Sequence, residues 1–144
     1  PDTAYRLFDI NLRQHYYNKG LIEESLYLSN VLKMNSDEMN QLKELFGLSG
    51  TEDEIAIWFM EKYNLRMVVL TAGASYSTVY TPDEVSTLPI PEVEVVDTVG
   101  AGDAFSAALI MSLLNGGTLK EAHRHAVKIA AFVCSNKGAW PVYE

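Results

Sequence analysis

The sequence predicts one α/β domain over residues 1–144, with a mostly parallel sheet and an antiparallel hairpin, because strand and helix patterns alternate along it. The continuous apolar run Met67–Leu70 is typical of a strand that is covered on both faces. Two segments rich in Thr, Tyr and Val follow, over 76–81 and 85–88, and they predict the antiparallel hairpin. A chain of this length buries about 68–70% of its unfolded surface, which is sufficient for one core.

The other expected elements are one strand and five helices. The strand is expected over residues 5–10, and the helices over 22–32, from about 35 to Gly47, from Thr51 onward, over 104–114, and from Thr118 to before Gly138. Ser/Thr-x-x-Glu patterns at Thr51 and Thr118 predict capping boxes. The helix over 104–114 is apolar on almost every side, so we expect it to be buried.

Composition narrows the function classes. The net charge is −8, which disfavours binding to the phosphate backbone of nucleic acid, although backbone N–H groups can still attract a small anion. No apolar run approaches the roughly 18–20 residues of a membrane span, and the start lacks the features of a signal peptide. Cys134 is the one cysteine, and the three histidines, which we expect on the surface, lack zinc-site spacing. We therefore expect a cytoplasmic protein without nucleic-acid or membrane partners.

The most informative stretch runs from Asp97 to Phe105. Gly100 and Gly102 flank Ala101 where an apolar helix opens, and the N–H groups of a first helical turn attract anions. Asp103 lies at the rim of this cradle, where a carboxylate can accept the proton of an attacking hydroxyl. The same residue could simply complement the helix dipole, which is worth about 0.3–1 kcal/mol, so the local pattern leaves both roles open.

Two other patterns carry polar side chains. Asn35 and Glu38 have the spacing of a helix N-cap with a reciprocal N3 glutamate, which by itself favours a purely structural cap. Asp9, Asn11 and Arg13 alternate, so they share one face at the carboxyl end of a strand, where open α/β sheets bind ligands. A solvated strand end explains the second pattern equally well. The dinucleotide fingerprint, the P-loop and the nucleophile elbow are all incomplete in this sequence.

The segment Asp97-Thr98-Val99-Gly100-Ala101-Gly102-Asp103-Ala104-Phe105 resembles the D-T-x-G-A-G-D-x-F signature of the ribokinase-like (PfkB) carbohydrate kinases. Three more stretches are similar to family motifs: Phe8–Arg13 to the F-D-x-N-x-R of fructokinase-like members, Asn35–Glu38 to N-x-x-E, and Lys137–Ala139 to K-G-A. The resemblance extends from about Arg6 to Pro141. It implies the carboxyl-terminal half of a three-layer α/β/α ribokinase-like fold.

The resemblance further implies ATP-dependent phosphoryl transfer to a sugar hydroxyl, and it gives each matching residue a role. Asp103 would be the general base, and the N–H groups of Gly100, Ala101 and Gly102 would form the anion hole. Asn35 and Glu38 would hold Mg²⁺ and phosphate, largely through water. Thr71 and Gly73 would line the phosphate and ribose side of the nucleotide, and Val127 would lie near the adenine. A K⁺ site would take Asp97 and the carbonyls of Val99, Val133 and Gly138.

Family members are considerably longer, and the sugar-gripping half and the lid are not represented in these 144 residues. We therefore expect a fragment with little or no turnover of its own, whose exposed sheet edge favours a homodimer. Fructose, ribose, 2-keto-3-deoxygluconate and nucleosides all remain open as acceptors. The alternative is a non-catalytic nucleotide-binding or regulatory module that has kept the anion cradle.

Overall fold

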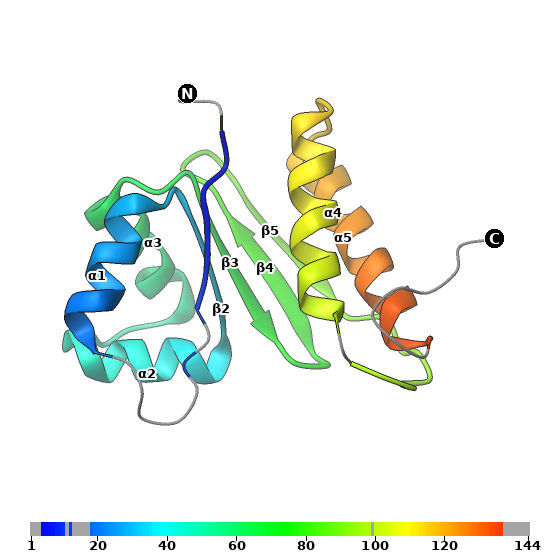
Figure 1. Ribbon diagram of the computed structural model, residues 1–144, viewed down its shortest axis with the longest axis horizontal. Helices are drawn as coiled ribbons and strands as arrows, with labels where there is room; N and C mark the ends of the chain where they lie inside the picture. Colours follow the sequence, from blue (N-terminus) through cyan, green and yellow to red (C-terminus); the bar gives the residue numbers. More distant parts are fainter. Residues whose placement is uncertain (1–3, 11, 13–17, 99, 137–144) are drawn as a thin grey trace. The chain divides into compact units, whose positions relative to one another are not determined.

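The computed structural model describes residues 4–10, 12, 18–98 and 100–136 (Figure 1). The elements in chain order are β1 (Leu7–Asp9), α1 (Lys19–Leu28), β2 (Val31–Asn35), α2 (Ser36–Phe46), α3 (Glu52–Tyr63), β3 (Met67–Ala72), β4 (Tyr76–Tyr80), β5 (Val85–Pro89), α4 (Ala101–Leu114) and α5 (Leu119–Cys134). They fall into two compact units, Pro1–Thr87 and Leu88–Glu144.

The sheet of the first unit has the strand order β1-β2-β3-β4-β5. β1, β2 and β3 are parallel, and β4 runs antiparallel to β3, so the strands predicted over 67–70, 76–81 and 85–88 are confirmed. In the register, Asp9 is opposite Lys33 and Asn35 is opposite Thr71. The carboxyl ends of the three parallel strands therefore meet at one edge, which is the usual place for a ligand in an α/β sheet.

The core of this unit forms between the sheet and α1, α2 and α3. The strands contribute alternate residues such as Leu32, Met34, Val68 and Leu70, because successive strand side chains point to opposite faces. The helices contribute Ile22, Leu26, Met39, Leu42, Ile55, Ala56, Phe59, Met60 and Tyr63. All four residues of the apolar run Met67–Leu70 are buried, as its lack of alternation predicts.

The helix predicted over 22–32 is wrong at its carboxyl end. α1 ends at Leu28, and Val31 and Leu32 begin β2. Asn30 lies between the helix and the strand. Its side chain accepts from the N–H of Arg6 at 2.7 Å and donates to the carbonyl of Ala4 at 2.7 Å. Pairing of β2 with strands on both sides outweighs the helical spacing of these apolar residues.

The second unit contains the helices α4 and α5, which pack against each other. The predicted capping box of α5 is present between Thr118 and Glu121. Of the box predicted at the start of α3, in the first unit, the structure shows one half, in which Thr51 accepts from the N–H of Glu54. The expectation that the helix over 104–114 is buried holds only for one side, since Met111 and Leu114 are 57% and 58% exposed. The expectation that all three histidines are on the surface is also wrong, because His123 is fully buried.

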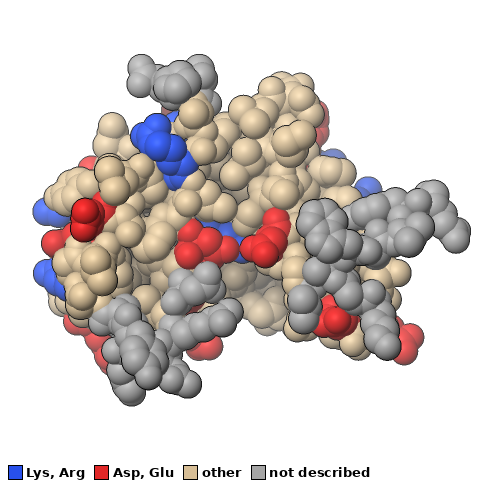
Figure 2. Space-filling model, in the orientation of Figure 1, with Lys and Arg blue, Asp and Glu red and all other residues tan. Residues whose placement is uncertain are grey.

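Figure 2 shows acidic side chains distributed over the face in view, with basic side chains between them. In the part of the chain that the structure describes, none of the helices has the length and apolar character needed to cross a bilayer.

Candidate functional site

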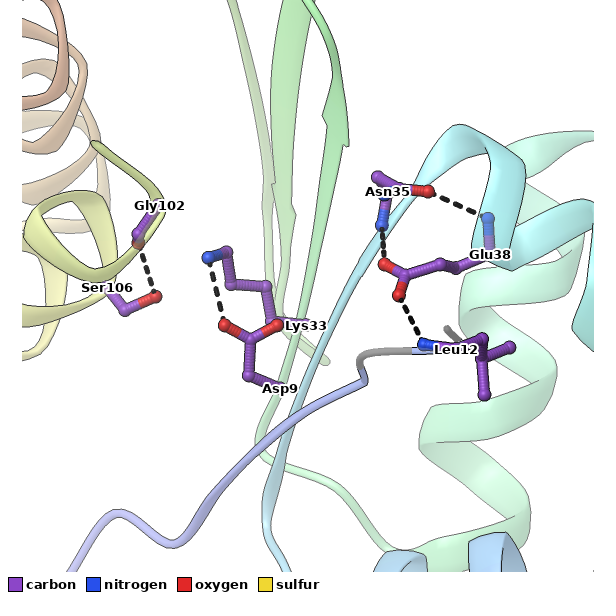
Figure 3. Close-up of polar contacts among 7 residues, drawn as sticks. All are labelled: Asp9, Leu12, Lys33, Asn35, Glu38, Gly102 and Ser106. Atoms are coloured by element: carbon purple, nitrogen blue, oxygen red, sulfur yellow. Dashed lines mark hydrogen bonds and ion pairs between the residues drawn. The ribbon is translucent and has the colours of Figure 1, made fainter. Parts of the chain in front are cut away.

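An ion pair joins the carboxyl end of β1 to the middle of β2. The Nζ atom of Lys33 lies 3.2 Å from Oδ2 of Asp9, its register partner (Figure 3). The lysine side chain is 8% exposed and that of the aspartate is 31% exposed. The pair therefore places a largely buried ammonium group in the middle of β2, two residues before Asn35 and on the same strand face.

The junction of β2 and α2 is built by Asn35 and Glu38. Asn35 Oδ1 accepts from the N–H of Glu38 at 2.8 Å, and Glu38 Oε1 accepts from the N–H of Asn35 at 2.9 Å. This is a complete capping box, so the structural cap is confirmed. Glu38 Oε2 also accepts from the N–H of Leu12 at 3.1 Å, although the side chain is buried. The metal-binding role of Asn35 and Glu38 stays a prediction.

Thr71 and Gly73 lie at the end of β3 and just after it. Thr71 is paired with Asn35, and its carbonyl accepts from the hydroxyl of Ser36 at 3.4 Å. Gly73 has a φ of 57°, in the left-handed region, and a Cβ added there would meet nothing within 4 Å. The first unit thus brings Asp9, Asn35, Glu38, Thr71 and Gly73 to one edge of its sheet, with space above Gly73.

In the second unit, Gly100 is the N-cap of α4, with a φ of 82° that favours glycine. Ala101, Gly102 and Asp103 form the first turn of the helix, and the carboxylate-bearing residue Asp103 is exposed. The N–H of Ala101 donates to the carbonyl of Thr98 at 3.2 Å, so this donor is engaged within the loop. The hydroxyl of Ser106 donates to the carbonyl of Gly102 at 3.1 Å and supports the same turn.

Asp97 lies beside the carboxyl end of α5. Its N–H and that of Val96 both donate to the carbonyl of Cys134, at 3.1 Å and 2.8 Å. Asp97 is thereby placed next to the turn of α5 that contains Val133, while the K⁺ site itself stays a prediction. Val127 is buried on α5. The other candidates, Val99, Gly138, Asn11 and Arg13, lie outside the described residues.

Lys33 was not among the candidate residues that the sequence indicates, and His123 was wrongly expected on the surface. Lys33 lies within the apolar segment of β2, two residues before Asn35. Had this segment been recognised as a strand, its period of two would have placed Lys33 on the same face as Asn35. His123 is 0% exposed, and burial lowers its pKa from 6.5 to about 4. Its ring packs edge-on against that of Phe105, with ring centroids 6.0 Å apart. Helical spacing was the available signal, because position 123 is four residues after Leu119 and four before Val127, on the buried face of α5.

Few side chains that could bind a cation lie at the sheet edge of the first unit or at the start of α4 in the second. The described residues contain no group of three or more His, Cys, Asp or Glu side chains that could hold a metal ion. Asn35 and Glu38 offer one amide oxygen and one carboxylate, which suits a hydrated ion held partly by a ligand's phosphates rather than a protein cage.

Comparisons with known proteins agree with these motifs. The family model described as pfkB family carbohydrate kinase matches residues 2–142. The aminoimidazole riboside kinase of Salmonella typhimurium is 32% identical over 146 aligned residues, which cover 94% of this chain and 44% of that protein. The chain thus spans less than half of the length of this relative.

Solved structures show the same fold. The aminoimidazole riboside kinase of Salmonella enterica, in complex with aminoimidazole riboside and an ATP analogue, has a TM-score of 0.71 at 29% identity and covers 94% of this chain and 47% of its own. A fructokinase variant of Vibrio cholerae, with bound fructose, ADP and potassium ion, has a TM-score of 0.73 at 27% identity. The match covers 94% of this chain and 46% of the fructokinase chain. The partial ribokinase-like α/β fold expected from the motifs is therefore confirmed.

Proposed function

The chain belongs to the pfkB family of carbohydrate kinases, and we propose from this premise that it takes part in ATP-dependent phosphorylation of a sugar-type hydroxyl. The observation that carries the proposal is the start of α4, where a left-handed Gly100 opens a glycine-containing first turn and Asp103 is exposed within that turn. A helix start attracts an anionic group, and a solvent-facing carboxylate there is placed to accept a proton rather than to pack in the core.

In the proposed reaction, the acceptor oxygen forms a bond to the γ-phosphorus while its proton passes to the carboxylate of Asp103. The bond between the γ-phosphorus and its bridging oxygen breaks, and ADP leaves. The N–H groups of Gly100, Ala101 and Gly102 would stabilise the charge on the transferred group, which requires Ala101 to exchange its 3.2 Å contact with Thr98 for the phosphate. That contact is at the long end of the N–H···O range and is therefore a weak competitor.

The residues at the carboxyl ends of β2 and β3 fit a magnesium–nucleotide complex. Mg²⁺ bound there would neutralise phosphate charge and would retain much of its water. Glu38 uses two of its roughly four acceptor positions on backbone N–H groups, so acceptors remain for water-mediated contacts. By resemblance, we assign Thr71 and Gly73 to the phosphates and ribose of ATP, and Val127 to its adenine.

Two further assignments rest on placement and resemblance. Asp97 and the carbonyl of Val133 would hold K⁺, which accords with the potassium ion in the Vibrio cholerae fructokinase structure. Asp9 would act on the phosphate or substrate side through its ion pair with Lys33. The acceptor class, whether hexose, pentose or nucleoside, is left open by these contacts.

The proposal is tested by incubating the full-length protein that carries this chain with ATP, Mg²⁺ and separate acceptors: fructose, ribose, 2-keto-3-deoxygluconate and a nucleoside. We expect ADP release that depends on one of these acceptors, and little or none from the 144 residues alone. Binding of ATP by the full-length protein without acceptor-dependent ADP release would favour the regulatory-module alternative.

A further inference from the structure

The described residues contain two complete capping boxes, and the one that begins α2 has an additional partner. In α5, Glu121 is exposed and makes the reciprocal bonds with Thr118. In α2, Glu38 is only 9% exposed, and its second carboxylate oxygen accepts from the N–H of Leu12, 26 residues earlier (Figure 3). The cap of α2 therefore reaches into a distant part of the chain, whereas the cap of α5 stays within its own helix.

The contact with Leu12 is the last of three that fasten the end of β1 to one continuous segment. The Asp9 carboxylate pairs with Lys33, the N–H of Ile10 donates to the Lys33 carbonyl at 3.0 Å, and the N–H of Leu12 donates to Glu38. Both partners, Lys33 and Glu38, belong to β2–α2. Among the described residues, the contact before that of Leu12 is made by Ile10, so Glu38 carries the attachment of Leu12 to this segment.

We propose that Glu38 is a positioning residue, whose carboxylate holds Leu12 at the junction of β2 and α2 and thereby fixes the ligand-binding edge of the sheet. Its effect on turnover rests on the proposed kinase function, but the lock formed by this contact does not. The role is separate from any contact of Glu38 with hydrated Mg²⁺, because it acts through the backbone of Leu12.

The chemistry explains why this position needs a carboxylate. Two N–H donors, from Asn35 and Leu12, converge on the two oxygens of one side chain. Glutamine offers one acceptor oxygen and one NH₂ donor, so one of the two N–H groups would face a donor instead of an acceptor. An aspartate side chain is one methylene shorter than glutamate, so from the same position its two oxygens would not reach both N–H groups.

The lock is tested without any activity by amide hydrogen exchange in Glu38→Ala, with Glu121→Ala as the matched control. Both variants lose the carboxylate of a capping box, but only Glu38→Ala removes the acceptor of the Leu12 N–H. We expect the amide of Leu12 to exchange about 10- to 100-fold faster in Glu38→Ala, as loss of a bond to a charged acceptor implies, and at the unaltered rate in Glu121→Ala. Unaltered exchange of Leu12 in a folded Glu38→Ala variant would overturn the proposal.

Turnover is tested in the full-length protein with Leu12→Pro, which removes the N–H donor and leaves Glu38 in place, against Leu12→Ala, which keeps the donor. At saturating Mg²⁺ we expect kcat to fall about tenfold more in Leu12→Pro than in Leu12→Ala, and Glu38→Gln to show a loss of kcat that added Mg²⁺ does not restore. Equal kcat values for the two Leu12 variants, or full rescue of Glu38→Gln by Mg²⁺, would contradict positioning. If Glu38→Gln fails to fold, the comparison of kcat between Leu12→Pro and Leu12→Ala decides whether the contact positions the site. If the wild-type protein has no turnover, the kinase proposal fails, and the hydrogen exchange of Leu12 still tests the lock.

Discussion

The carboxylate of Asp9 lies 3.2 Å from the ammonium group of Lys33, and the lysine is the more deeply buried partner. This asymmetry predicts that the two single substitutions have unequal costs. Asp9→Asn removes the charge that compensates a buried ammonium, so we expect it to lower the free energy of unfolding by about 2 kcal/mol. Lys33→Met leaves a partly exposed carboxylate that water can reach, and we expect a loss below about 1 kcal/mol.

Urea unfolding of the wild type, the two single variants and the double variant measures this difference. The denaturation midpoint should shift while the m-value stays constant. An equal or larger loss for Lys33→Met would show that burial of the ammonium does not control the energetics of the pair.

The buried His123 predicts a pH-dependent stability. Burial lowers its pKa from 6.5 to about 4, so between these values the unfolded chain binds more protons than the folded chain. The free energy of unfolding should therefore fall as the pH drops through 6.5 and should stop falling from this cause below about 4. The full contribution is up to about 3 kcal/mol, at 1.36 kcal/mol for each unit of pKa.

The measurement is urea unfolding between pH 4 and pH 7.5 for the wild type, His123→Gln and His125→Gln. The His123→Gln variant should lose most of this pH dependence, since its side chain does not titrate. The exposed His125 on the same helix serves as the control, and its variant should keep the wild-type profile. The same slope in wild type and His123→Gln would assign the pH dependence to other groups.

The two glycines of the α4 start predict opposite effects on stability. Gly100 has a φ of 82°, so Gly100→Ala should lower the free energy of unfolding by about 1–2 kcal/mol. Gly102 lies within the helix, where alanine is intrinsically favoured by up to about 1 kcal/mol. Its added methyl group would nevertheless lie in the proposed anion cradle, so Gly102→Ala should be at least as stable as the wild type and yet lower kcat/KM by at least about tenfold.

Thermal unfolding and ATP-dependent turnover of the full-length Gly102→Ala variant give the two readouts. A more stable and less active variant would separate the anion-binding role of this glycine from its structural role. Wild-type turnover in Gly102→Ala would remove Gly102 from the proposed anion hole.

The motifs and most of the elements were predictable because they depend on local chemistry. The cap at Asn35, the glycine-rich start of α4 and the strand Met67–Leu70 are encoded within a few adjacent residues. The β2 strand was missed because Val31 and Leu32 continue the helical spacing of α1, and only pairing with β1 and β3 makes them a strand. The contact of Glu38 with Leu12 depends on packing between segments 26 residues apart, which a single sequence does not reveal. The buried face of α5 was predictable from helical spacing, but a histidine within it was read as a surface residue because of its polarity.

The central claim is that the exposed carboxylate of Asp103 accepts the proton of the acceptor hydroxyl. Asp103→Asn keeps the size and hydrogen-bonding capacity of the side chain, whereas Glu121→Gln makes the same change of charge in the first turn of α5 and serves as the control. If Asp103 only complemented the helix dipole, both variants would lose about 0.3–1 kcal/mol of stability and neither would lose chemistry.

The most direct measurement is therefore the single-turnover rate of phosphoryl transfer in full-length Asp103→Asn, made alongside its dissociation constant for ATP. We predict a rate about 10²- to 10⁴-fold below that of Glu121→Gln, with ATP affinity within a few-fold of the wild type. Phosphoryl transfer by Asp103→Asn at the rate of Glu121→Gln would contradict the assignment of the base.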